Sequence, residues 1–234
     1  MIAGAAVADG HHSFFLNPAL VVSESRLQAG VSYSRPYGLQ GLAWGRACAG
    51  WSSQTVAAGA GFSSLQLGRY GEHDAQVVVG GTPARSIAVG LGIHALIVSD
   101  SPNTGDMVPA FDVGVCWQSD RVRVGGAGLR LNSPRWREGT EVPVRMVLAG
   151  SWYPVDEVLL AMDVSRERGE EDATFGAEFR PIRQLGLRLG VGVVPLRYAA
   201  GLAATVGPVQ LEYSYQFHPT LKESHLLGLR AAWR

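Results

Sequence analysis

Apolar and polar positions alternate along residues 85–98, RSIAVGLGIHALIV. Odd positions from Ile87 to Ile97 are apolar, whereas the even positions carry Ser86, small residues and His94. A period of two is typical of a β-strand with two different faces. In a soluble half-buried sheet the second face would carry solvated side chains such as Lys and Glu, and here it is mostly small. The segment therefore predicts a strand whose second face does not meet bulk water.

The same alternation recurs between turn signals along most of the chain. It is clear in residues 27–34, 111–117, 144–152, 158–165, 185–193, 211–217 and 227–233, and weakest in residues 41–51. Residues 122–131 change phase at Gly125-Gly126, where a β-bulge would restore the two faces. Together these segments predict about fourteen strands.

The connections between these strands differ on the two sides of the predicted sheet. On the side of the N-terminus they are short, at residues 52–54, 82–84, 119–120, 154–156, 181–184 and 207–208. On the other side they are longer and polar, at residues 35–40, 68–73, 99–107, 133–141, 166–171 and 218–223. This asymmetry is typical of outer-membrane barrels. The fold class predicted is all-β, a transmembrane antiparallel up-and-down β-barrel of about 14 strands with a short N-terminal plug.

A barrel of this kind requires an apolar outer wall and an inner wall that faces an enclosed lumen, because hydrocarbon leaves backbone groups no partners outside the chain. By parity, charges of both signs fall on the lumen side, at Arg123, Arg130, Arg145, Asp163, Glu178, Arg180, Arg188, Glu212 and Arg230. Aromatic residues near strand ends would suit the two interfacial girdles, at Tyr33, Trp117, Trp152, Phe179, Tyr215, Phe217 and Trp233.

Composition supports a membrane protein and argues against a nucleic-acid partner. The 234 residues include 20 basic and 20 acidic ones, so no surplus of cations is available to neutralise phosphates. Only 17% of the residues are charged, fewer than in ordinary soluble domains, and no apolar run is long enough for a membrane-spanning helix. The first residues lack the features of a secretory signal, so we expect no signal peptide in this chain. The barrel pattern predicts the outer membrane as the location. Cys48 and Cys116 are expected to be unbonded, buried side chains.

Residues 1–25 have no alternation long enough for a span, and Asn17-Pro18 opens a turn. We expect a plug, or hatch, over residues 1–25 and the barrel over residues 26–234. A frayed tail is the alternative, although Phe14, Phe15 and Leu16 would be poorly suited to solvent.

The stretch GAAVADGHHSFFLNPALV resembles the N-terminal signature of the FadL-like outer-membrane barrels, including the PorV/PorQ group, with Asn17, Pro18 and Ala19 matching its last motif. The closing stretch LEYSYQFHPTLKESHLLGLRAAW is similar to that group's final hairpin, with His218 and Pro219 at the turn and His225 opening the last strand. The resemblance implies an N-terminal hatch inside the barrel. It further implies either diffusion of hydrophobic compounds or, in the PorV branch, handling of secreted proteins. Long surface loops are missing here, and the chain ends in Trp233-Arg234 instead of an aromatic residue.

Catalytic and metal chemistry is not expected from this sequence. The glycine pairs in GLGIHA and elsewhere do not open a helix, which phosphate binding requires. His11-His12 are adjacent, and His73, His94, His218 and His225 lack metal-ligand spacing. A triad drafted from Ser86, His94 and Asp163 has no fixed geometry. We therefore expect no enzyme activity, no metal and no cofactor.

Three functions remain open. The first is a passive channel for small hydrophobic compounds, and the second is an accessory or shuttle barrel of a secretion system. The third is a structural barrel without transport. The partners expected are outer-membrane lipid, a small hydrophobic ligand for the channel, and envelope or secretion-system proteins for the shuttle.

Overall fold

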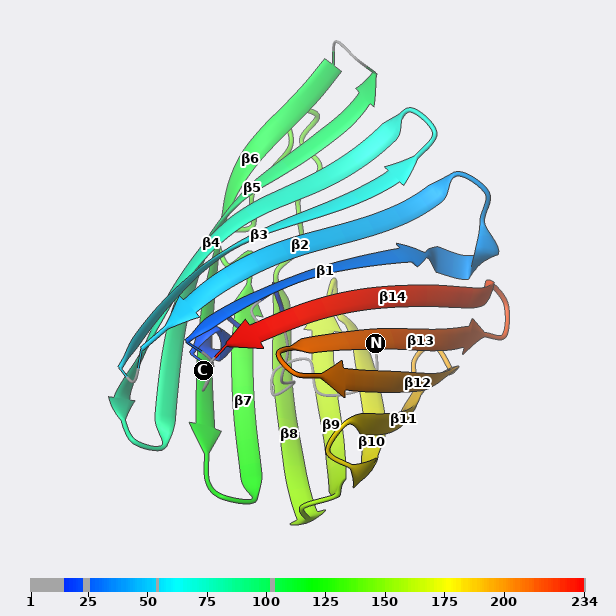
Figure 1. Ribbon diagram of the computed structural model, residues 1–234. Coiled ribbons are helices and arrows are strands. Elements are labelled where there is room, and N and C mark those ends of the chain that lie inside the picture. The colour runs from blue at the N-terminus through cyan, green and yellow to red at the C-terminus, as the bar shows by residue number, and fades with distance from the viewer. Residues whose placement is uncertain (1–14, 23–25, 54, 102–103, 234) are drawn as a thin grey trace.

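A computed structural model of the chain describes residues 15–22, 26–53, 55–101 and 104–233. Its fourteen strands form one closed antiparallel barrel in which each strand pairs with its neighbours in sequence (Figure 1). The strands are β1 (Leu27–Arg35), β2 (Leu42–Ser52), β3 (Val56–Leu67), β4 (Tyr70–Ala84), β5 (Ile87–Ser101), β6 (Thr104–Gln118), β7 (Val122–Leu129), β8 (Arg145–Val155), β9 (Val158–Glu167), β10 (Glu170–Ile182), β11 (Leu185–Gly192), β12 (Arg197–Val206), β13 (Val209–His218) and β14 (Lys222–Trp233).

Pairing of the first strand with the last closes the barrel. β1 pairs with β14 in an unbroken register from Leu27↔Trp233 to Arg35↔His225. Every strand therefore has two partners, and no open edge remains among the named strands. The predicted fold class and strand number are confirmed, including the weakly patterned second strand.

The alternation in the sequence separates an apolar outer wall from a small or polar inner wall. Outward side chains such as Leu148 and Leu189 expose 63% and 66% of their surface. The aromatic residues proposed for the girdles are all outward and exposed as well. A continuous apolar wall of this size is unfavourable in water and favourable against hydrocarbon. Among the described residues, no helix is long and apolar enough to cross a membrane.

The β-bulge predicted at Gly125-Gly126 is wrong. β7 pairs with β6 and with β8 in continuous register through both glycines. Odd-numbered positions point inward along the whole strand, so Ala127 and Leu129 face the lumen, where both are buried. The phase of the pattern changes because this part of the inner wall is itself apolar, with Val147 opposite Ala127.

The short connections on the N-terminal side are confirmed, since none of the six exceeds three residues. The prediction of long connections on the other side is mostly wrong. β9 and β10 are joined by Arg168 and Gly169 alone, and β3 and β4 by Gly68 and Arg69 alone. The polar residues expected in loops continue the strands instead, so that β4, β5 and β6 each reach 15 residues. Residues 130–144, between β7 and β8, form the one long connection in the described part of the chain.

Candidate functional site: the barrel interior

Residues 15–22, which we call the luminal segment, lie inside the barrel against β4, β5 and β6. The segment contains a short 3-10 helix, η2 (Pro18–Val21), and its residues are buried except for the half-buried Val22. Asn17 caps this helix, because its Oδ1 accepts from the backbone N–H of Ala19 at 3.0 Å. Its Nδ2 donates to the carbonyl of Val115 on β6 at 3.1 Å, which ties the turn to the wall.

Glycines on the inner wall make room for this segment. Gly80, Gly90 and Gly114 are paired across β4, β5 and β6. A Cβ at Gly90 would overlap the Pro18 backbone, and one at Gly114 would overlap the Asn17 side chain. At Gly80 it would lie 2.8 Å from Cγ1 of Val21. The small face in residues 85–98 is therefore the surface on which the luminal segment lies.

Apolar contacts hold the segment on both sides of this glycine row. Phe15, Leu16 and Val21 form a buried cluster with side chains of β3, β4 and β8, among them Val78 and Val147. Ala19 and Leu20 form a second cluster with Cys116 on β6. Cys116 and Cys48 are not joined in a disulfide; Cys116 is buried, whereas Cys48 is half-buried.

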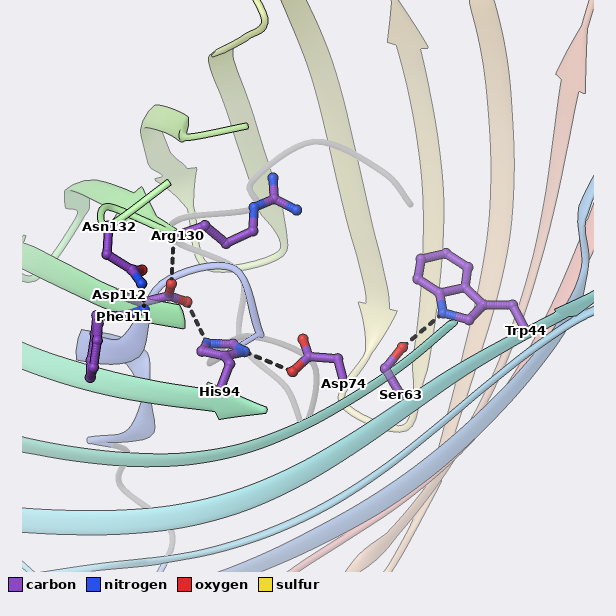
Figure 2. A network of polar contacts seen from close by, with 8 residues as sticks. All are labelled: Trp44, Ser63, Asp74, His94, Phe111, Asp112, Arg130 and Asn132. Carbon is purple, nitrogen blue, oxygen red and sulfur yellow. Dashed lines mark hydrogen bonds and ion pairs between the residues drawn. The ribbon is translucent and has the colours of Figure 1, made fainter. Parts of the chain in front are cut away.

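A polar network lies beside the luminal segment on the inner faces of β4, β5 and β6 (Figure 2). His94 contacts Asp74 through Nδ1 at 2.8 Å and Asp112 through Nε2 at 2.6 Å. Asp112 is 2% exposed and also accepts from the backbone N–H of Arg130 at 2.7 Å. Each ring nitrogen of His94 therefore contacts a carboxylate. Asp163, considered above for a catalytic triad with His94, is not one of these two carboxylates.

An aromatic and cationic group lies on the adjoining inner face of β2. The Arg46 guanidinium stacks over the Trp44 ring at 3.9 Å and lies 5.3 Å from the Phe15 ring. The indole N–H of Trp44 donates to Ser63 on β3 at 2.9 Å (Figure 2). Trp44 and Phe15 thus both offer ring faces to the Arg46 cation.

Ion pairs link the polar residues of β10 to β13. Glu178 pairs with Arg180 and, at 2.7 Å, with Arg188. Arg188 reaches Glu212 at 3.3 Å, so three strands are connected through one arginine. These four predicted luminal residues therefore form one chain of ion pairs, which we call the ladder.

The other predicted residues do not join that ladder. Arg130 pairs with Glu167 at 2.9 Å, and Arg145 donates to Ser165 at 3.3 Å. Asp163 is buried on β9, and Arg123 lies partly buried on β7. The Nε atom of Arg230, on β14, is buried and has no hydrogen-bond partner.

The residues of the terminal hairpin are separated by the wall. His218 is buried, and its Nδ1 accepts from the backbone N–H groups of Thr220 and Leu221, at 3.2 and 3.1 Å, in the turn that contains Pro219. His225 lies on the outer face of β14, at 2.8 Å from the hydroxyl of Tyr213. His11, His12, Phe14 and Arg234 lie outside the described residues.

Sequence reasoning missed Arg46, Asp74, Gln76 and Asp112. Parity alone places Asp112 on the inner face with Gly114, and the same test on β4 would have found Asp74 and Gln76. Arg46 was missed because Trp44 and Arg46 share a face in the weakly patterned second strand. Within the described residues, no group of His, Cys, Asp and Glu side chains could hold a metal ion.

Comparison with known proteins shows which solved structures share the fold of this barrel. No family model matches the chain, and no curated protein matches its sequence. Among solved structures, a CymD monoaromatic hydrocarbon channel matches with a TM-score of 0.74 at 13% identity, over 99% of this chain and 95% of that one. The toluene transporter TodX of P. putida matches with a TM-score of 0.74 at 9% identity, over 97% and 95%. A FadL homologue of Pseudomonas aeruginosa matches with a TM-score of 0.67 at 12% identity, over 100% and 96%.

At these identities the likeness establishes a shared barrel fold. It extends over at least 95% of each chain in all three comparisons. The described neighbours give no support to a PorV/PorQ relationship.

Proposed function

We propose that this protein is an outer-membrane channel for small hydrophobic compounds, in which the N-terminal residues act as a hatch. The observation that carries the proposal is the luminal segment, docked on glycines inside a closed barrel with an apolar outer wall. A segment held inside a barrel by non-covalent contacts alone can block passage and can be displaced. The fold shared with CymD and TodX supports the same function.

The lumen residues predicted from sequence have a place in this proposal. The ladder of Glu178, Arg180, Arg188 and Glu212 holds β10 to β13 together from inside while leaving few unpaired charges on that wall. Asn17, Pro18 and Ala19 fix the hatch to β5 and β6. The terminal hairpin closes the barrel, with His218 ordering its turn.

The test is uptake of toluene into liposomes with a hatch that can be locked. Ala19 lies in one cluster with Cys116, so Ala19→Cys in a Cys48→Ala background provides a thiol pair. We expect toluene uptake to exceed that of empty liposomes, to fall after oxidation and to return after reduction. The matched control is Ala19→Cys with both native cysteines replaced by Ala, which has no partner thiol.

Uptake that equals empty liposomes would reject the channel and favour a structural barrel. Uptake unaffected by a disulfide that forms fully would reject the hatch. The shuttle function expected as an alternative receives no support from the structural neighbours and is not proposed.

A further inference from the structure

The side-chain amide of Gln76 is buried inside the closed barrel without hydrogen-bond partners. Its side chain is 3% exposed, and neither its Oε1 nor its Nε2 has a hydrogen-bond partner. A buried amide without partners is unfavourable, and most buried polar side chains in proteins are paired. Gln76 lies on the inner face of β4, paired in register with Gly61 on β3 and His94 on β5.

Phe15 of the luminal segment covers this amide. A Cβ built on Gly61 would meet Cζ of Phe15 at 2.6 Å and Nε2 of Gln76 at 3.1 Å. The ring and the amide therefore adjoin over the same glycine. An aromatic ring cannot satisfy both the donor and the acceptor of an amide.

Arg46 adjoins the same ring and also lacks an anionic partner. Its guanidinium is stacked on Trp44 and Phe15, which leaves the N–H edge of the fork available. Its Nε is buried and has no hydrogen-bond partner, and it forms no ion pair within the described part of the chain. By contrast, Arg188 and Arg197 on the same inner wall each pair with a carboxylate.

A second arginine, Arg230, lies farther along the same inner wall. Its register neighbours along the inner wall are Gly30 and then Cys48, and Cys48 is the register partner of Gly61. Gly30, Cys48 and Gly61 therefore form a floor of small residues between Arg230 and Gln76. Asp74 and Arg145 are the other charged groups that act on Arg46, and Asp74 is already bonded to His94.

We propose that Gln76 and Arg46 form a binding site for a small aromatic carboxylate, whose ring takes the place of Phe15. The carboxylate binds the edge of the Arg46 guanidinium and the Gln76 amide, and the ring lies on Gly61 beside Trp44. This inference rests on the proposed channel and adds to it a binding site for one class of aromatic ligand. Binding would displace the luminal segment at its first described residue.

The test is binding of benzoate to the full chain in detergent micelles, followed by calorimetry, with acetate and toluene as partial ligands. We expect benzoate to bind more tightly than acetate. Arg46→Gln and Gln76→Leu should each weaken benzoate binding about tenfold, because each removes a hydrogen bond to a charged group. Phe15→Ala should tighten it, since the competing ring is absent. Gln210→Leu is the matched control, because the Gln210 amide already donates to Thr205 at 3.1 Å.

Gln76→Leu has a second expected effect that a loss of folding would not give. Removing the unpaired amide should raise the temperature at which the barrel unfolds, while Gln210→Leu should not. Equal benzoate affinity in wild type and Arg46→Gln, acetate binding as tight as benzoate, or no benzoate binding would each overturn the inference. If toluene uptake persists in those cases, the channel stands and only the aromatic carboxylate site fails.

Discussion

Gly90 and Gly114 show what the absence of a side chain achieves inside this barrel. Both have ordinary strand conformations, so no turn or positive φ requires glycine there. What requires it is the close approach of Asn17, Pro18 and Ala19. The sequence displayed these glycines clearly and predicted an N-terminal plug, but it did not show that Pro18 and Asn17 would lie on them.

Gly90→Ala should undock the luminal segment, because the added Cβ would overlap the Pro18 backbone and the segment can leave more easily than the wall can bend. In a Cys48→Ala background we expect Cys116, now buried beneath Ala19 and Leu20, to react with a maleimide about tenfold faster through local opening. Gly186→Ala is the control, since its Cβ would meet its neighbours at 3.4 Å or more. Equal rates in the two variants would contradict this account.

The network centred on His94 can be tested by removing its central residue. His94→Leu leaves Asp74 and Asp112 without their shared partner, and Asp112 is almost fully buried. We expect a loss of about 3 kcal/mol in the free energy of unfolding, as for other buried ion pairs that lose one member. Urea titration followed by the gel mobility of unheated samples measures it.

A second substitution separates charge from packing at this position. Adding Asp112→Asn to His94→Leu should recover part of the loss, because one unpaired buried charge is removed. His73→Gln is the control, since His73 lies on the outer face, stacked on Phe62. A His94→Leu variant as stable as wild type would show that the network contributes nothing to folding.

The turn between β9 and β10 illustrates how an element ends in this protein. Arg168 and Gly169 have φ of 54° and 83°, so both central residues of this two-residue hairpin are left-handed. That geometry matches the twist of the flanking strands. The charged run around it suggested a loop, but the tight turn lets β9 and β10 run to their full lengths.

Substitutions at the two positions of this turn should change the stability of the barrel differently. Gly169→Val places a β-branched residue at positive φ and should destabilise the barrel by about 1–2 kcal/mol. Arg168→Asn should be neutral or slightly stabilising, because Asn tolerates this conformation better than Arg. Unfolding midpoints in urea measure both changes. Equal effects of the two variants would exclude the two-residue turn.

At the scale of the whole molecule, the outer and inner walls of the barrel should differ in how well they tolerate a charged side chain. Leu189→Arg places a charge on the outer face of β11, where it should cost about 2–4 kcal/mol in a bilayer. Ala199→Arg, on the inner face of the neighbouring β12, should cost much less, because the lumen is polar. Folding yield into lipid vesicles, read from gel mobility, compares the two. Equal yields would contradict the assignment of the walls.

The sequence by itself determined the barrel, because strand parity, strand number and the positions of the short turns on one side are local properties of the chain. It also predicted which wall is apolar and that Glu178, Arg188 and Glu212 share the other one. The prediction failed where the inner wall is apolar, as at Ala127 and Leu129. The alternation shows which positions are apolar, but it does not show whether an apolar side chain points outward or into the lumen. Only the tertiary structure decided which luminal groups meet: that His94 lies between Asp74 and Asp112, and that Phe15 covers Gln76. Those contacts depend on shear between strands and on where the N-terminal residues lie, and neither leaves a periodic signal in the sequence.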